Sequence, residues 1–315
     1  MQKRPFIIDC DTGTDDAIAI IAALYSDEVE VRAITSVNGN VEHKYVCQNN
    51  LDLMEYLDQD VPVAKGAVKA FRDMNLHSND GTHGATGLGT LTLPKAQHKQ
   101  FDPRIAAQVI YETAVEEKGE LELLVIGPMT NIAIALLQYP ELPGLIKHIW
   151  FMGGAAVGGN VNTTAEFNIW VDPEAAHVVM ESGIPMTMAG LDVTLKAAMI
   201  EEDAAELRAC GTRAANFVAD LLEFMFRRRD SGLEDALMHD ALALGAALCP
   251  ECLTCKDCFV DVECFGQYTR GHTAVDLKGR SGKPANVSVA LGIDVPRFRR
   301  WLVDAVKNSA KLGDK

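Results

Sequence analysis

The chain has 315 residues, of which 48% are apolar and 23% charged, the composition of an ordinary globular protein. Its 44 acidic and 29 basic residues give a formal net charge of −15. A surface of that sign repels phosphate backbones, which argues against a nucleic-acid polymer as partner but not against an uncharged small substrate.

The N-terminal segment MQKRPFIIDCD carries two basic residues and then runs directly into a short apolar stretch. It has no long apolar region followed by a small-residue cleavage site, so we expect no signal peptide. The chain has no run of about 18 apolar residues, so we expect no membrane span. A cytoplasmic enzyme is the resulting expectation.

The first half of the chain alternates short β-branched runs with longer helical patterns, which is typical of a parallel α/β sheet. Ligands of such a sheet bind beyond the carboxyl ends of its strands. We therefore expect an open, mostly parallel, Rossmann-like sheet with helices on both faces and functional residues in the strand-end loops. The predicted strands are 5–9, 29–37, 61–66, 121–127, 148–154 and 185–190, and the predicted helices are 15–26, 44–57, 104–119, 130–139 and 173–183.

The last third of the chain does not show this alternation of strands and helices. A long helical stretch is predicted over 201–229, with further helices at 239–248 and 297–312 and strands at 258–266 and 286–293. These elements predict an additional C-terminal elaboration of helices and strands. No linker, low-complexity tract or internal repeat divides the sequence, so we expect a single domain over residues 1–315.

Four carboxylates follow the first predicted strand, at Asp9, Asp11, Asp15 and Asp16. Acidic residues often cap a helix N-terminus, which accounts for Asp15 and Asp16 but not for Asp9 and Asp11, whose side chains point the same way on extended chain. Four adjacent carboxylates do not all ionise at neutral pH unless a cation lies among them. Because Ca²⁺ takes about six to eight oxygen ligands, the cluster predicts a divalent-cation site with calcium as the candidate.

Four further motifs follow the aspartates in a fixed order: Val-Asn-Gly-Asn at 37–40, Gly-Pro-Met-Thr-Asn at 127–131, Ala-Glu-Phe-Asn at 165–168 and Met-His-Asp at 238–240. Together they make the chain resemble the inosine–uridine preferring nucleoside hydrolase family from Phe6 to about Ile293. The family usually has proline where Thr12 stands, a departure that we expect to leave the metal site intact. The resemblance implies calcium-dependent hydrolysis of ribonucleosides to ribose and free base, in nucleoside salvage or catabolism, by a homodimer or homotetramer.

The same resemblance assigns roles to individual residues. Asp11 matches both a calcium ligand and the general base acting on the calcium-bound water, and Asp9 matches a supporting residue behind it. The other implied calcium ligands are Asp16, Asp240 and the backbone carbonyl of Ile126. The implied substrate-binding residues are Asp15, Asn40, Glu166 and Asn168 on the ribose hydroxyls, Met152 and Asn160 in the same pocket, and His83 near the base.

These roles suit the chemistry of N-glycoside cleavage, which passes through an oxocarbenium-like transition state. Calcium orients the attacking water and the ribose diol and lowers the pKa of that water. Carboxylates around the sugar stabilise its developing positive charge. The departing base leaves more easily when protonated, and His239 resembles the family histidine proposed as its general acid.

The match fails over residues 227–237, where family members often carry tyrosine or glutamine to contact the base. This chain has Arg227-Arg228-Arg229-Asp230-Ser231 there. Arg227 is a candidate contact, since a guanidinium can stack or donate hydrogen bonds. A solvated helix end, with cations favoured by the helix dipole, explains the three arginines equally well. The base preference stays open.

Four cysteines, Cys249, Cys252, Cys255 and Cys258, follow the pattern C-x₂-C-x₂-C-x₂-C. That spacing is typical of zinc or iron–sulfur sites. It misses the two-residue period of a strand, however, so Cys255 and Cys258 on one strand would face opposite sides. We favour free thiols in a reducing compartment over a structural metal, and a structural metal over disulfides.

Two other functions fit part of the pattern. In a haloacid-dehalogenase-like phosphatase Asp9 would be the nucleophile and Asp11 the acid/base, but that scheme gives no role to Asp15, Asn40 or Glu166. A catalytically silent nucleoside- or sugar-binding protein would not need both Asp11 and His239. Hydrolysis of ribonucleosides is therefore the function that we expect.

Overall fold

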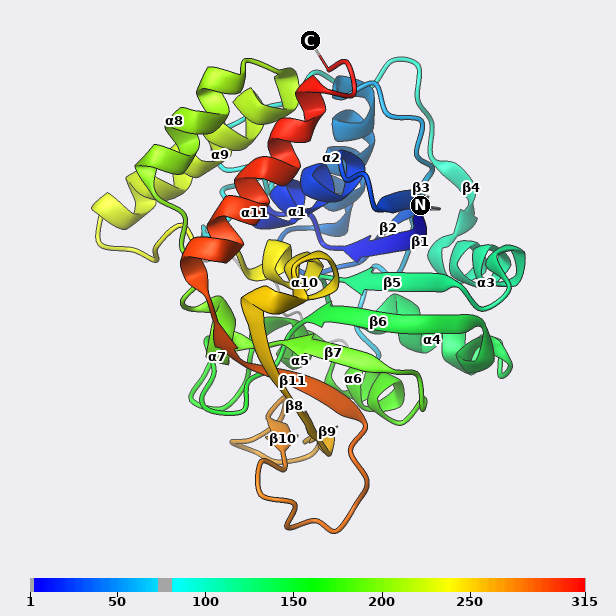
Figure 1. Ribbon diagram of the computed structural model, residues 1–315. Coiled ribbons are helices and arrows are strands. Elements are labelled where there is room, and N and C mark those ends of the chain that lie inside the picture. The colour runs from blue at the N-terminus through cyan, green and yellow to red at the C-terminus, as the bar shows by residue number, and fades with distance from the viewer. Residues whose placement is uncertain (1–2, 73–80, 315) are drawn as a thin grey trace.

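A nine-stranded sheet runs through the centre of the molecule in the order β4-β3-β2-β1-β5-β6-β7-β11-β8 (Figure 1). The computed structural model describes residues 3–72 and 81–314. The sheet strands are β1 (Arg4–Cys10), β2 (Val29–Ser36), β3 (Val63–Lys65), β4 (Asp102–Ile105), β5 (Leu121–Val125), β6 (Ile146–Met152), β7 (Met186–Ala189), β8 (Leu253–Cys258) and β11 (Val287–Ile293). Every neighbouring pair is parallel except β11 and β8. The predicted α/β class and mostly parallel sheet are confirmed.

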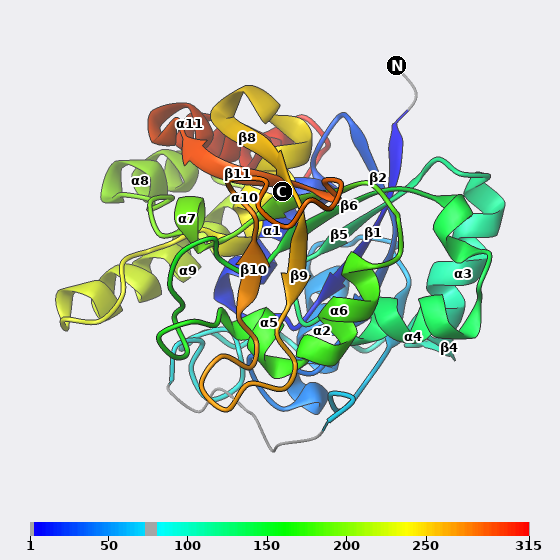
Figure 2. The same cartoon turned by 90° about the horizontal axis from the view of Figure 1, so that it is seen from below.

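Helices cover both faces of this sheet because successive strand residues alternate between the faces. Phe6 and Ile8 of β1 pack with α1, α10 and α11 on one face, whereas Ile7 packs with α3, α4 and α6 on the other. Figure 2 shows α10 and α11 on one side of the strands and α4 and α6 on the opposite side. The helices are α1 (Thr14–Leu24), α2 (His43–Tyr56), α3 (Ala106–Glu117), α4 (Thr130–Gln138), α5 (Phe167–Val171), α6 (Pro173–Met180), α7 (Leu191–Thr194), α8 (Glu201–Cys210), α9 (Arg213–Asp230), α10 (His239–Leu248) and α11 (Val295–Lys307).

The helical stretch predicted over 201–229 is two helices, α8 and α9. Gly211 adopts φ 78°, in the left-handed region that glycine occupies without strain, and this ends α8. The Thr212 side chain then accepts a hydrogen bond from the backbone N–H of Ala215 and begins α9. The glycine that ends α8 and the threonine that begins α9 are both visible in the sequence.

The C-terminal elaboration is present but is arranged differently from the prediction. The strand predicted over 258–266 is only β9 (Val260–Val262), which pairs with β10 (Thr273–Val275) in a separate two-stranded sheet. The edge of the main sheet is instead β8, a strand that the sequence analysis did not identify. Most side chains of β8 are exposed or half-buried, so the apolar alternation that predicts a strand is absent.

The order of the strands places the functional loops. From β1 the chain builds outward through β2 and β3 on one side, and from β5 through β6 and β7 on the other. Strand order therefore reverses between β1 and β5, and such a switch point forms a crevice at the carboxyl ends of the strands. The loops that follow β1, β2, β5 and β6 converge there. Within the described residues no helix combines the length and apolar character needed to cross a membrane.

Candidate active site

A cavity of about 410 Å³ contains most of the predicted site residues. Of these residues, Asp11, Asp16 and Arg227 are the ones that do not line it. Its described lining comes from the strand-end loops, the 82–83 segment, the end of α9 and the start of α10: Thr14, Asp15, Asn40, Thr82, His83, Ile126, Met152, Asn160, Val161, Glu166, Phe167, Asn168, Trp170, Met225, Arg228, Glu234, Asp235, Leu237, His239 and Asp240.

Asp11 lies directly after β1 and is fully buried. Its Oδ2 accepts a hydrogen bond of 2.7 Å from the backbone N–H of Asn40. Two glycines close around the carboxylate: a Cβ at Gly39 would overlap it, and a Cβ at Gly127 would come within 2.9 Å of Oδ1. Oδ1 has no hydrogen-bond partner among the described residues. The chain thus fixes Asp11 and leaves one carboxylate oxygen available.

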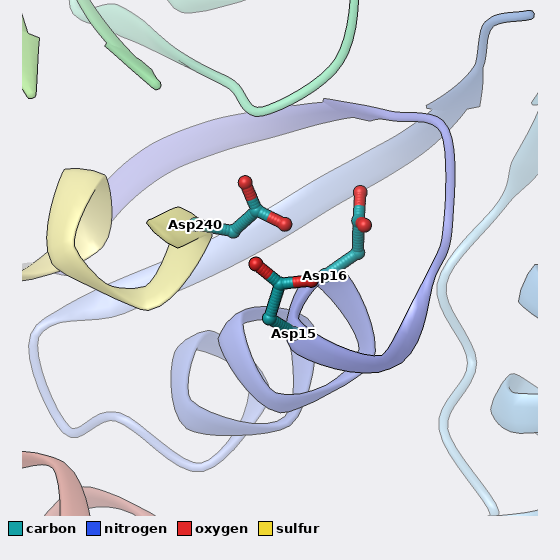
Figure 3. Close-up of side chains that lie close together, drawn as sticks. All are labelled: Asp15, Asp16 and Asp240. Atoms are coloured by element: carbon teal, nitrogen blue, oxygen red, sulfur yellow. The ribbon is translucent and has the colours of Figure 1, made fainter. Parts of the chain in front are cut away.

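Asp15 and Asp16 stand in the first turn of α1, and Asp240 stands in the first turn of α10, more than two hundred residues away along the chain. Figure 3 shows the three side chains gathered at the ends of the two helices. Each offers a carboxylate oxygen, and these oxygens lie within 4.8 Å of one another. In the described part of the chain, this is the group of acidic, histidine or cysteine side chains placed closely enough to hold a metal ion.

Burial and mutual repulsion act against ionisation of this cluster. Burial, followed by the charge of Asp15, raises the pKa of Asp16 to about 7. Burial is also the main reason why the pKa values of Asp11 and Asp240 lie well above their usual range, with Asp16 and Asp15 as the next causes, respectively. A cation among these oxygens would remove that penalty.

The donor set fits a hard divalent cation. Asp16 accepts hydrogen bonds at Oδ2 from the backbone N–H of Gly13 (2.8 Å) and from Asn40 Nδ2 (3.1 Å). Its Oδ1, like Oδ1 of Asp11, is buried with no described partner. Unpartnered carboxylate oxygens of this kind are the ligands that calcium prefers. Asp15, predicted as a ribose contact, belongs to the compact group with Asp16 and Asp240, whereas Asp11, predicted as a ligand, does not.

Asp9 lies behind the cavity rather than in it. Its Oδ1 accepts hydrogen bonds from Thr35 Oγ1 (2.5 Å) and Asn131 Nδ2 (2.7 Å), and burial raises its pKa to about 7. Asn131 also donates to the carbonyl of Ser36 and accepts at Oδ1 from the backbone N–H of Ala67. It therefore ties β1 to the loops after β2 and β3. Asn131 stands in a motif that we recognised, but the sequence analysis gave it no role.

Glu166 and Asn168 hold the wall of the cavity that follows β6. Glu166 caps α5: Oε1 accepts from the N–H of Asn168, and Oε2 accepts from those of Gly154 and Ile169. Asn168 Nδ2 donates to the carbonyl of Ile126 at 3.1 Å, which leaves that carbonyl its second lone pair for another partner.

The carbonyl of Met152 also accepts from Asn168 Nδ2, at 3.2 Å. Asn160, exposed at the rim, accepts at Oδ1 from the N–H of Phe167. The structure thus brings together the residues predicted to contact the ribose.

Two histidines also line the cavity. The backbone N–H of Thr14 donates to His83 Nδ1 at 3.1 Å, and a Cβ at Gly13 would overlap the imidazole ring. His239 Nδ1 lies 2.9 Å from Thr194 Oγ1 and its Nε2 lies 3.9 Å from Glu234 Oε1. Burial lowers the pKa of His239, but the carboxylates of Glu234 and Asp15 outweigh burial and raise it.

The three consecutive arginines at the end of α9 have different surroundings. Arg227 is exposed and lies outside the cavity lining, whereas Arg228 lines the cavity. Arg228 Nη2 donates to Thr82 Oγ1 at 3.4 Å, and its buried Nε has no described hydrogen-bond partner. Arg229 forms ion pairs with Glu201 and Asp230. Arg228 and Glu234 are site residues that the sequence analysis missed.

The cysteines form no metal group in the described part of the chain. Cys249 and Cys252 form a disulfide with a Cα–Cα distance of 5.5 Å. The prediction of free thiols is wrong for this pair, because the turn between α10 and β8 brings the two side chains together. Cys255 and Cys258 are free, and one is exposed while the other is buried, so their predicted opposite orientation on a strand is confirmed.

A family model, whole sequences and solved structures all match the chain to nucleoside hydrolases. Residues 6–300 match the family model described as inosine-uridine preferring nucleoside hydrolase. The chain is 41% identical over 311 residues to the pyrimidine-specific ribonucleoside hydrolase RihA of Shewanella sp. (strain ANA-3), covering 97% of this chain and 96% of that one. It is 39% identical over 309 residues to the non-specific ribonucleoside hydrolase RihC of Klebsiella pneumoniae (strain 342), covering 97% and 99%.

Solved structures agree in fold. A purine-preferring ribonucleoside hydrolase from Gardnerella vaginalis superposes with a TM-score of 0.90 at 34% identity, covering 98% of this chain and 100% of that one. The plant nucleoside hydrolase PpNRh1 gives a TM-score of 0.89 at 28% identity, covering 97% and 99%.

Proposed function

The chain belongs to the inosine–uridine preferring nucleoside hydrolase family, whose members cleave ribonucleosides to ribose and free base, and we propose that it does so with Asp11 as general base beside a bound calcium ion. The observation that carries this proposal is that Oδ1 of Asp11 and Oδ1 of Asp16 are buried carboxylate oxygens without described partners; Oδ2 of Asp9, behind the cavity, is the third. Asp240, whose carboxylate offers an oxygen within 4.8 Å of one from Asp16, and the carbonyl of Ile126 would complete the protein ligands.

The ion and the aspartates depend on each other. Calcium, when bound, would supply the positive charge that keeps the buried carboxylates ionised and lowers the pKa of a neighbouring water. Ionised Asp11 then accepts a proton from the attacking water. The N–H of Asn40 holds this carboxylate through Oδ2, which keeps a second lone pair for the proton, while Oδ1 is the oxygen left for the ion.

The ribose end of the cavity is acidic and rich in hydrogen-bonding groups. Asp15, Asn40, Glu166 and Asn168 line it together, and a ribose diol offers both donors and acceptors to such a set. As water attacks C1′ and the bond to the base nitrogen breaks, positive charge develops on the sugar. The buried carboxylate of Glu166, fixed by three backbone N–H groups, stabilises that charge without having to reorient.

The electron pair of the broken bond goes to the base. His239 lines the cavity, and the Glu234 carboxylate beside it favours the protonated imidazole. His239 therefore donates the proton that neutralises the departing base. Its Nδ1 is held by Thr194 Oγ1, so the ring keeps one orientation. Arg227 is exposed, so we assign the contact with the base to Arg228 instead.

The proposal is tested by measuring release of free base from inosine, uridine, cytidine, adenosine and guanosine, with and without a calcium chelator. We expect the chelator to abolish turnover and added calcium to restore it. Asp11→Ala should lose turnover on every substrate that the wild type cleaves. Asp257→Ala, which removes an exposed carboxylate from β8, is the matched control and should leave turnover unchanged. Undiminished base release by Asp11→Ala, or by the chelated wild type, would refute the proposed mechanism.

A further inference from the structure

We propose that Arg228 stabilises the departing nucleobase and gives preference to bases that carry an exocyclic carbonyl oxygen. The inference rests on the proposed function, because it assigns a task within the same cleavage reaction. It concerns the segment where the chain departs from the usual residues of its family.

The position of Arg228 is the first reason. Its side chain lines the cavity at the end of α9, where Nη2 reaches Thr82 Oγ1 on the neighbouring wall. No described hydrogen bond or ion pair links it to the aspartate cluster. Its charge acts instead on Glu234, whose carboxylate is shared with His239. Arg228 is therefore a permanent cation in a lining that is otherwise rich in carboxylates.

The unused hydrogen-bonding capacity of Arg228 is the second reason. Its Nε is buried without a described partner, and its one described hydrogen bond, to Thr82, is long at 3.4 Å. The terminal N–H groups of the guanidinium, on Nη1 and Nη2, can therefore donate to an acceptor on a ligand in the cavity that Arg228 lines. Neither neighbour offers this: Arg227 is exposed and Arg229 is engaged by Glu201 and Asp230.

The charge that develops on the base is the third reason. When the bond between C1′ and the base nitrogen breaks, both electrons stay with the base. In uracil and hypoxanthine this negative charge spreads onto exocyclic oxygens, whereas adenine has no such oxygen. A guanidinium stays protonated at every relevant pH and only donates, so Arg228 forms a charge-assisted hydrogen bond to that oxygen without giving up its proton.

That hydrogen bond strengthens as the reaction proceeds. The oxygen is neutral in the bound nucleoside and carries part of a negative charge in the transition state, so the interaction lowers the barrier rather than only improving binding. Met225 and Leu237 also line the cavity, and their apolar surface reduces screening of the charge. His239 protonates a base nitrogen, whereas Arg228 acts on an oxygen, so the two contributions are separable.

Arg228→Met tests the proposal, because it keeps an unbranched side chain of similar reach and removes the charge. The substrates are uridine, adenosine and 4-nitrophenyl riboside, whose nitrophenolate leaves without help. We expect kcat/KM for uridine to fall about 10- to 100-fold, the usual worth of a hydrogen bond to a charged group. The values for adenosine and the nitrophenyl riboside should change much less. Arg227→Met, on the exposed side of the same helix, is the matched control and should alter none of the three.

Equal losses on all three substrates would overturn the proposal, as would an unchanged rate with uridine. If Arg228→Met melts below the wild type, Arg228→Gln carries the comparison: it donates hydrogen bonds without charge, so we still expect a selective loss on uridine, and wild-type selectivity would refute the role of charge. The wild-type assays with chelator and the Asp11→Ala variant report on the proposed function, whereas the ratio of uridine to adenosine turnover reports on Arg228. The two can therefore fail independently.

Discussion

Gly39→Ala is the substitution that most sharply tests how the chain holds Asp11. A Cβ at position 39 would lie 2.7 Å from Asp11 Cγ and 2.8 Å from Asp11 Cβ. Carbon atoms in contact normally stand about 3.5–4.0 Å apart, so the Asp11 side chain must move by roughly 1 Å. A displacement of about 1 Å in a catalytic group costs on the order of 10²-fold in rate, or about 2.7 kcal/mol of barrier.

The assay is kcat for uridine at saturating substrate and calcium, together with the midpoint of urea unfolding. We expect kcat to fall about 100-fold and stability to fall by about 1–3 kcal/mol, since the added methyl overfills a packed site. Gly144→Ala is the matched control: it stands in the 3₁₀ helix Leu142–Leu145, and its Cβ would meet no atom within 4 Å. Wild-type kcat in Gly39→Ala would show that Asp11 is not held as described.

Three further predictions follow from burial, ion pairing and the thiols. In the folded, chelated protein Asp9 and Asp16 have pKa values of about 7, so both stay largely protonated at pH 5, whereas in the unfolded chain, with a pKa of about 4, they are ionised. The free energy of unfolding is therefore highest below pH 4 and falls as the pH rises toward 7. Melting temperatures at pH 5 and 7 check this, and the loss should shrink when calcium is present. Glu122→Ala removes the acceptor of Arg4 Nε and Nη2 and of Trp150 Nε1, while Arg4 Nη1 keeps the carbonyl of Ala247, so it should cost about 2 kcal/mol in urea unfolding; a cost below about 1 kcal/mol would contradict the network. Alkylation in denaturant without reductant should label six of the eight cysteines by mass spectrometry, because Cys249 and Cys252 are paired; eight labels would exclude the disulfide.

The parts of the fold that the sequence predicts are those with strong periodicity. β1 and β5 read as continuous apolar runs because helices cover both faces of the sheet, and α1 follows β1 through a glycine and a pair of aspartates. β4 and β8 lie at the two edges of the sheet, and their polar sequences DPRI and LTCKDC carry no alternation. α5 has five residues, too few to display a helical period.

The candidate site, too, has residues that the sequence predicts and residues that it does not. The aspartates after β1 stand close together along the chain, so local spacing alone suggests a cation site. Asp240 comes from the distant α10, and only the family resemblance connects it with them. Arg228 and Glu234 belong to the end of α9 and the irregular turn after it, where no period indicates which side chain faces inward. Arg227 and Arg228 are adjacent in α9, and the turn of the helix exposes Arg227 and brings Arg228 to the cavity.

The cation bound by the aspartates is the centre of the proposed mechanism, and stoichiometric reconstitution tests it most directly. Chelated, dialysed protein is titrated with calcium while uridine hydrolysis and heat of binding are recorded together. We predict that turnover rises from baseline and saturates at one calcium per chain, and that Asp11→Ala shows no turnover at any calcium concentration. Full hydrolysis by the calcium-free protein would contradict the account.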